Sequence, residues 1–534
     1  MAQDNSVEGS ASFDNGNGNS RDQDDDSNES PSKRRRVFLQ TMGQQLREVG
    51  VGNDSRNGGS SNTVPGTIGA VLNDSPGHEH RSGRQVHIQT PESDAVPGED
   101  DQVSTMPSSA NKALWRPGEV IVSSEIHDNN AFNFDDLVDW TRSYFDHWHP
   151  PFPFLHAPTV LKYFDKMTDP HSDLSPYELI ILRSVSSISL ADRRQTGNVQ
   201  HPIPQHLVFT SLNDAIQSAQ SLLVEESTIQ ALQAIVSVQL FLISMLRYNA
   251  ASRLEALASR MAFHLGLHRC PRQSRLFSTK DAELRQRIFW SMYSIDRYIC
   301  IRLGIPLGIR DADVDTCFPT VERHTQGTAE IQSESLFFHP HQCVADMVGY
   351  DGRFDLVELL ARHTKIRGNI TELRNRSLTH KSTEHDEAIT IEAEMTKWWN
   401  DVDELLENDE SMTTAVSDYH RLVLIVSRSE AIIALNKHIL ATTKSEAAYN
   451  SALQNCITAA RAIITTIHKA VDKGDCQDGQ LPRDKDSIGL MWPSFTWAIW
   501  MSTFLVIYAA NENQVKYDIA IRFVASRVFP GLYH

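Results

Sequence analysis

Two histidines one helical turn apart are the first residues of this sequence whose types and spacing could bind a metal ion. His264 and His268 stand four positions apart in a segment of helical periodicity, so their rings share one face of the helix. A zinc site needs further ligands, and a metalloprotease carries a glutamate between its two histidines. No such glutamate and no evident third ligand accompany the pair, so His268 is interpreted as a structural residue. His78 and His80, in a polar segment, receive the same interpretation.

An acidic loop is the second candidate metal site. Its carboxylates occupy positions 1, 3, 5 and 12 of a calcium-loop template: Asp311, Asp313, Asp315 and Glu322. Thr316 stands where the template requires glycine, however, and Pro319 stiffens the loop. We therefore expect a loop that is solvated or paired with Arg302 or Arg310, and no metal site.

Asp296 and Arg297 form a charged pair inside an apolar helical stripe. We expect a structural ion pair with Arg287 or Glu283, because no nucleophile can be named beside them. The chain also lacks a Gly-x-Ser-x-Gly elbow, a phosphate-binding loop and a dinucleotide fingerprint. These features predict a protein that is not an enzyme and that holds no cofactor in this chain.

The six cysteines and the net charge narrow the class further. No cysteines stand in a Cys-x-x-Cys pair, so isolated reduced thiols are expected. The net charge of −18 opposes binding to nucleic acid, where phosphate contacts dominate affinity. Any DNA contact must therefore come from a local basic segment or from another module.

Residues 1–112 predict a disordered acidic and polar tail. They are rich in Asn, Ser, Gly and Asp and hold too few apolar residues to offset the entropy of the chain. A short helix is expected at 32–50, where a basic run precedes a heptad-like seam. The run consists of Lys33, Arg34, Arg35 and Arg36. It is either a nuclear-import patch or a linker leading into a dimerisation helix, and the sequence leaves both open.

From Trp115 onward the chain predicts an all-α domain. Asn133 is expected to cap a helix that ends before Pro150, and further helices are expected near 252–265, 284–303, 353–376, 386–408, 417–440, 456–467, 492–510 and 519–528. Residues 320–350 are expected to form a loop. The apolar segment 495–510 is shorter than the roughly 18 residues of a membrane span and is predicted to be a buried helix.

The segment 252–319 carries the most specific pattern in the chain. A first helix ends in Gly266-Leu267-His268-Arg269, and a long second helix is expected to end at Gly304 in a left-handed cap. The order and spacing of these motifs resemble the middle homology region of fungal transcription factors, the xylanolytic-type regulatory domain. Its matching positions are Gly266, His268, Arg287, Trp290, Asp296, Arg297, Gly304, Pro306, Asp311, Asp313 and Pro319. The similarity extends over about 135–510, within a domain expected at 113–534.

The resemblance implies a multi-helix regulatory domain of a nuclear transcription regulator. In that family a zinc cluster with six cysteines reads DNA, but no cysteine precedes Cys270 here. Zinc is therefore expected only if an N-terminal cluster exists, and DNA contact only through such a cluster or a partner factor. A homo- or heterodimer, a small-molecule inducer or a repressor protein are further expectations, and no membrane is expected. The alternative function is a DNA-binding-deficient partner, or dominant-negative scaffold, of a full-length relative.

Overall fold

The computed structural model describes residues 113–116, 118–121, 132–169, 171–196, 202–224, 226–272, 276–319, 353–375, 384–408, 416–443, 445–475 and 495–528. The tail expected at 1–112, with its basic run and its short helix at 32–50, lies outside this part of the chain, and so does the loop expected at 320–350. Within the described residues the fold is all-α, as predicted. The only strands there are a two-residue parallel pair, β1 (Val120–Ile121) with β2 (Ile203–Pro204).

The first helices form around an aromatic stripe. Asn133 caps α2 (Phe134–Ser143) in a reciprocal capping box with Asp136, which confirms the predicted start. A π-helical turn, Tyr144–Trp148, extends this helix to the proline turn, and its stripe from Leu137 to Trp148 is buried as expected. Helices α3 (Ala157–Thr168) and α4 (Pro176–Thr196) follow. After them come α5 (Leu212–Gln220), a short 3-10 helix (Ser221–Val224) and α6 (Ile229–Ser244).

Helix α6 is buried on nearly every face. It packs against α7 (Tyr248–His264), and α7 packs against α8 (Thr279–Leu303). Ser278 caps α8 through the backbone N–H of Asp281. Gly304 ends α8 with φ of +66°, a conformation that costs glycine nothing, which confirms the predicted left-handed cap. The following loop contains one 3-10 turn, Asp311–Asp313.

The second half of the chain consists of longer helices. These are α9 (Arg353–Asn375), α10 (Glu384–Asn408), α11 (Asp418–Thr442), α12 (Glu446–Asp475), α13 (Phe495–Asn511) and α14 (Tyr517–Arg527). Helix α11 is capped by Ser417 and runs without a break through Val426–Ser429. Helix α12 is far longer than the predicted 456–467. No helix among the described residues has the length and apolarity to cross a membrane, and α13 is an interior helix, as predicted.

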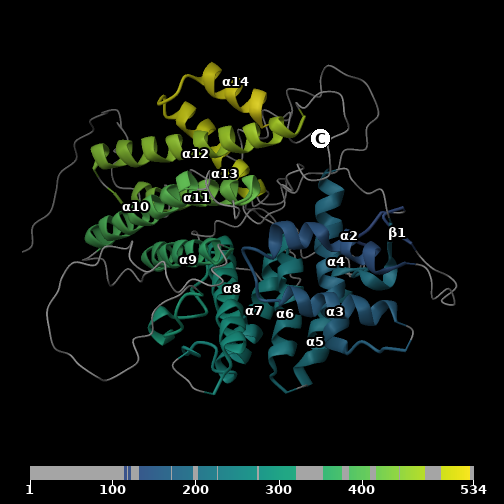
Figure 1. Cartoon of the computed structure of the whole chain (residues 1–534). Coiled ribbons are helices and arrows are strands. Elements are labelled where there is room, and N and C mark those ends of the chain that lie inside the picture. The colour runs from purple at the N-terminus through teal and green to yellow at the C-terminus, as the bar shows by residue number, and fades with distance from the viewer. Residues whose placement is uncertain are drawn as a thin grey trace, which may run out of the picture.

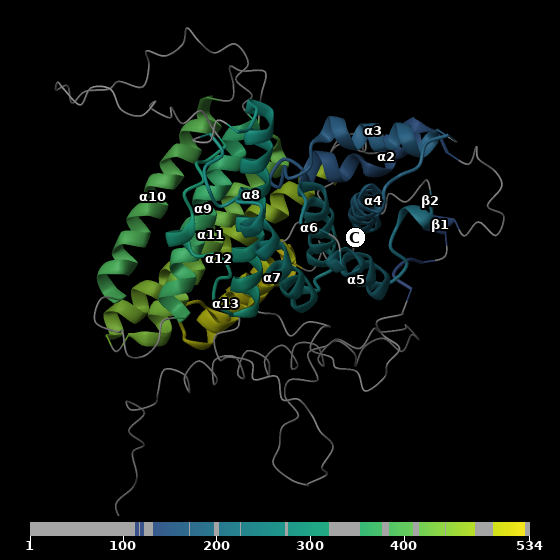
Figure 2. The same ribbon diagram turned by 90° about the horizontal axis from the view of Figure 1, so that it is seen from below.

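The long helix α8 lies between the two halves. In Figures 1 and 2, α2 to α6 lie on one side of α8 and α9 to α11 on the other. The main hydrophobic cluster runs from α2 through α8 and continues onto α11 to α14, while a second cluster joins α9, α10 and α11. Side chains of α8 therefore reach both halves of the molecule.

Candidate functional site

Three charged side chains of α8 are buried in the middle of the molecule. Asp296, Arg297 and Arg302 are each at most 1% exposed. A buried charge is costly unless a partner and hydrogen bonds compensate for the lost water. The partners of these three residues therefore identify the contacts that hold the centre of the domain together.

Asp296 anchors the loop that follows α8. Its carboxylate accepts hydrogen bonds from the backbone N–H groups of Gly308 (3.0 Å) and Ile309 (3.3 Å). Arg297 Nη1 donates to the same carboxylate at 2.8 Å. The predicted partners, Arg287 and Glu283, are wrong: the pair is formed by neighbours along one helix, and the loop supplies the rest.

Arg297 also binds the acidic loop. Its Nη2 donates to the Ile309 carbonyl at 2.8 Å and to Asp311 at 2.5 Å, and its guanidinium lies 3.4 Å from the centre of the Tyr293 ring. Tyr293 donates its hydroxyl to the same Asp311 oxygen at 2.7 Å. The predicted pairing of this loop with Arg302 or Arg310 is thus wrong for Asp311, because Asp311 pairs with Arg297.

A buried carboxyl on α7 lies behind this cluster. Glu255 accepts from Gln239 Nε2 at 2.7 Å and from the Ser259 hydroxyl. Burial, together with the negative charge of Asp296, raises the pKa of Glu255 to about 8. At neutral pH, Glu255 is therefore mostly protonated. Burial also raises the pKa of Asp296, against the lowering by Arg297 and by the backbone N–H groups of Gly308 and Ile309.

Arg302 connects α8 to the second half of the chain. Its Nη2 donates to Glu430 of α11 at 3.0 Å, and Arg367 of α9 donates to the other oxygen of Glu430 at 3.2 Å. The Arg302 guanidinium also lies 3.8 Å from the centre of the Trp497 ring of α13. One buried carboxylate thus joins three helices.

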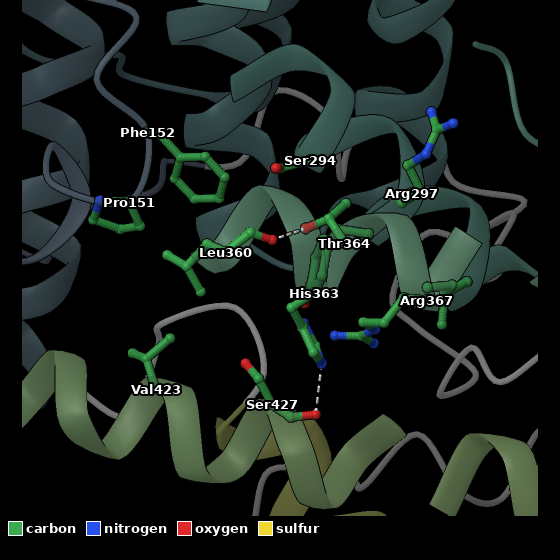
Figure 3. Close-up of a pocket in the computed structure, with 12 residues that line it drawn as sticks. Pro151, Phe152, Ser294, Arg297, Leu360, His363, Thr364, Arg367, Val423 and Ser427 are labelled. Atoms are coloured by element: carbon green, nitrogen blue, oxygen red, sulfur yellow. Dashed lines mark hydrogen bonds between the residues drawn. The ribbon is translucent and has the colours of Figure 1, made fainter. Parts of the chain in front are cut away.

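A small pocket lies between these two charged clusters. Its volume is about 60 Å³, and it is lined by the proline turn, α8, α9 and α11. The lining is apolar at Phe152, Leu360 and Val423 and polar at Ser294 and Arg367 (Figure 3). Arg297 belongs to the lining as well, so the pocket borders both clusters.

His363 forms one wall of the pocket as a neutral ring. Burial, with the charge of Arg367, lowers the pKa of His363 to about 3. Its Nε2 lies 3.0 Å from the Ser427 carbonyl, which can only accept, so this nitrogen carries the proton (Figure 3). Since Arg297 and Arg367 already face carboxylates, the pocket as a whole presents hydrogen-bonding groups rather than net charge.

The structure brings most of the family-pattern residues together around α8. Trp290 donates its Nε1 to the Cys317 carbonyl at 2.8 Å and stacks on Phe318. Gly266 has φ of +69° after α7, and the His268 ring packs edge-on against Phe263. Both residues therefore shape the turn that follows α7.

The remaining pattern residues lie at the edges of this region. The Pro306 carbonyl accepts from the Cys300 thiol at 3.3 Å, and Pro319 is buried. Arg287 is half-buried on α8 and Asp313 is exposed, so neither belongs to the central clusters. The basic run Lys33–Arg36 lies outside the described residues and stays a prediction. Among the described residues, no group of three His, Cys, Asp or Glu side chains is placed to hold a metal ion.

Sequence reasoning missed Glu255, Glu430 and Arg367. Each is a charged residue on a helix that carries other charged residues, so the local pattern does not mark it as one that is paired inside the protein. Glu430 lies in the short polar stretch that separates two apolar runs of α11, the first ending at Val426 and the second beginning at Ala431, and this position gave no sign of burial.

Comparison with known proteins gives one family. Residues 141–399 match the model described as "Fungal specific transcription factor domain", within the similarity expected at 135–510. A "Probable transcription factor FUP6" of Fusarium proliferatum is 24% identical over 419 residues, which cover 69% of this chain and 57% of that protein. The "Transcriptional activator protein acu-15" of Neurospora crassa is 23% identical, over 49% of this chain and 26% of that protein.

A third relative covers a similar share of both chains. The "Fusaridione A cluster transcription factor fsdR" of Fusarium heterosporum is 22% identical over 61% of this chain and 62% of that protein. The chain thus spans between about a quarter and three fifths of the length of these relatives. No solved structure matches it.

Proposed function

Because the chain carries a fungal specific transcription factor domain, we propose that it regulates transcription and that its helical domain is the part that responds to a signal. The pocket between α8, α9 and α11 is the site of that response. The observation that carries the proposal is the origin of the lining. It comes from α8 itself, from α9 and α11 on one side of α8, and from the proline turn on the other side.

The position of the pocket allows a bound molecule to change how the two halves pack. A ligand shifts a conformational equilibrium only through a difference in its affinity for the two states. Groups on α8, α9 and α11 all face this cavity, so any movement of α9 and α11 relative to α8 changes its shape. A molecule that fits one arrangement therefore favours that arrangement.

The chemistry of the lining indicates what binds. Ser294, the His363 ring and Arg367 offer hydrogen bonds, while Phe152 and Leu360 offer apolar contact. The Arg297 guanidinium points away from these side chains (Figure 3). The cations are already neutralised by Asp296, Asp311 and Glu430. A small uncharged polar molecule, or the polar end of a larger inducer, suits this site; a segment of a repressor protein is the other occupant that the regulatory role allows.

We place this function in the nucleus, with the basic run Lys33–Arg36 as the import signal. DNA is contacted through a zinc cluster or a partner factor, since the net charge of −18 gives the chain itself no affinity for phosphates. Pairing with a second copy or with a related factor brings such a module to the promoter.

A tethering experiment tests the function directly. The full chain is fused to an unrelated DNA-binding module and expressed in fungal cells that hold a reporter with the cognate site. We expect reporter transcription to differ from that with the module alone by several-fold, upward for an activator and downward for a repressor. A fusion that is abundant, nuclear and bound to the site but leaves transcription unchanged under all growth conditions contradicts the proposal.

A further inference from the structure

Two buried thiols from distant parts of the sequence lie in contact. Cys270 follows α7 and Cys317 follows α8, and their Sγ atoms are 3.2 Å apart. Their residues are 5% and 9% exposed. We propose that Cys270 and Cys317 are a site of reversible oxidation, at which a peroxide converts the dithiol into a disulfide that links the end of α7 to the acidic loop.

Other contacts hold the two segments side by side independently of the thiols. The Asp315 backbone N–H donates to the His268 carbonyl at 3.0 Å, and the Thr316 hydroxyl donates to the Leu267 carbonyl at 2.7 Å. In return the Cys270 backbone N–H donates to the Asp315 carboxylate at 2.7 Å. These three bonds hold the two segments, and with them both thiols, side by side.

Gln286 gives Cys317 a specific hydrogen-bond donor. Its Nε2 lies 2.6 Å from the Cys317 sulfur, and its Oε1 accepts from Arg272 Nε at 3.2 Å. A guanidinium can only donate, so the oxygen of the amide must face Arg272 and the nitrogen must face the sulfur. The amide thus stabilises negative charge on Cys317, and the thiolate is the form that reacts with oxidants.

The surroundings give a small oxidant a short path. The neighbouring side chains of Arg269 and Asp315 are 63% and 45% exposed. The thiol pair therefore lies one residue beneath the surface, whereas Cys456 is completely buried in α12.

The reaction balances in two steps. The Cys317 thiolate attacks one peroxide oxygen, the O–O bond breaks, and the products are a sulfenic acid and water once the leaving oxygen has taken up protons. The Cys270 sulfur then attacks the sulfenic sulfur, the S–O bond breaks, and a second water leaves as the S–S bond forms. Overall the two thiols lose two electrons and two protons to one peroxide, and a dithiol reductant reverses the change.

The consequence for regulation rests on the proposed function. The loop that the disulfide would tie down also carries Asp311, which holds Arg297 at the edge of the pocket. Oxidation therefore restrains the pocket wall through this loop. The formation of the bond itself does not depend on any role in transcription, so the two proposals can fail separately.

The test is a thiol map of the purified full chain. The reduced protein is treated with hydrogen peroxide, unfolded in the presence of an alkylating agent, digested and analysed by mass spectrometry. We expect a linked peptide containing Cys270 and Cys317, about 2 Da lighter than its two reduced parts together. Treatment with a dithiol should restore both alkylatable thiols, and Cys456 should be alkylated throughout.

Variants separate a specific reaction from general reactivity. Cys270→Ser and Cys317→Ser should each abolish the linked peptide, while the matched change Cys456→Ser should leave it unchanged. Gln286 is a positioning residue, and Gln286→Leu should slow closure about tenfold at neutral pH, because a hydrogen bond to a charged group is worth at least that factor. The same variant should shift the pH profile of the closure rate upward, which a merely structural role would not do.

The wild-type protein alone is enough to overturn the proposal. If both cysteines remain alkylatable under peroxide that closes a reference dithiol peptide in the same tube, the pair is not a redox site. Oxidation of each cysteine separately, or pairing with other cysteines of the chain, overturns it equally. Failure of a variant to fold does not affect this decision.

Discussion

Glu255 and Asp296 show how single buried groups set the properties of this domain. Both carboxyl groups are buried in the core, and Arg297 donates a hydrogen bond to Asp296. The pKa of Glu255 therefore rises to about 8, while its ordinary value is 4.5. The cost of ionising Glu255 inside the protein should be visible as a dependence of stability on pH.

Between pH 4.5 and about 8 the native chain holds this proton and the unfolded chain does not. The free energy of unfolding must then fall as pH rises through this range, by at most about 1.4 kcal/mol per pH unit. Glu255→Gln removes the titrating group, so the stability of the wild type relative to this variant should fall from pH 5 to pH 8 in urea denaturation. Asp192→Asn is the matched control: burial raises the pKa of Asp192 to about 6, so its effect should end near that pH. If the difference in free energy of unfolding between the wild type and Glu255→Gln is independent of pH, Glu255 does not have a raised pKa.

The close approach of Gly308 to Asp296 leads to a second prediction about a single residue. A Cβ atom at Gly308 would lie 2.8 Å from Asp296 Oδ1, too close for any side chain unless the anchored carboxylate moves. Gly308→Ala should lower the free energy of unfolding by about 2 kcal/mol. Gly266→Ala serves as a comparison, because its positive φ costs about 1 kcal/mol although no atom lies within 4 Å of the added carbon. A Gly308→Ala protein as stable as the wild type would show that the loop does not bind Asp296 so closely.

At the scale of elements, α8 acts as the connector of the domain. Its Asp296 and Arg297 hold the loop that follows it, and Arg302 holds α11 through Glu430. The two sets of contacts lie on the same helix and border the same pocket. A displacement of α8 thus reaches both halves of the chain.

Arg302→Met tests the second of these connections. It removes the cation and leaves the buried Glu430 carboxylate with Arg367 alone, so a loss of roughly 3–5 kcal/mol is expected from chemical denaturation. Adding Glu430→Leu should restore part of this loss, because the uncompensated charge is then gone. The exposed pair Arg142–Asp139, 3.5 Å apart, provides the control: Arg142→Met should cost less than about 0.5 kcal/mol. Equal losses for Arg302→Met and Arg142→Met would contradict the role given to α8.

The sequence predicts the helices far better than the contacts between them. The α2 cap at Asn133, the end of α8 at Gly304 and the buried α13 all follow from local periodicity and local chemistry. The partners of Arg297 and Arg302 do not, since Glu430 lies 128 residues from Arg302 in the chain. The same holds for Cys270 and Cys317, which no spacing rule joins. Such pairs depend on how the helices pack against one another, and the local sequence pattern does not determine that packing.

At the scale of the whole molecule, the chain is acidic overall, while the charged side chains buried at the centre of its helical domain are paired. The net charge of −18 separates this protein from nucleic-acid binders with a basic face, and the basic run Lys33–Arg36 stands alone in an otherwise acidic and polar segment. That contrast is the reason we propose the run as the nuclear-import signal.

Replacing Lys33, Arg34, Arg35 and Arg36 together by alanine should move the protein out of the nucleus. The measurement is the nuclear fraction of a full-length fluorescent fusion, which we expect to fall several-fold. A control variant changes four polar residues of the same segment to alanine and keeps the basic run. Unchanged nuclear accumulation of the alanine variant would exclude the run as the import signal.

The most direct test of regulation through this domain combines the pocket with transcription. Ser294→Leu fills the cavity from α8, and Ser526→Leu makes the same change on the exposed face of α14. Both variants of the full chain are tethered to the reporter promoter and compared with the wild type at equal abundance. We expect Ser294→Leu to fix reporter transcription at one level, regardless of the growth conditions that change the wild-type level, while Ser526→Leu follows the wild type. If Ser294→Leu responds as the wild type does, the pocket is not the site through which this domain is regulated.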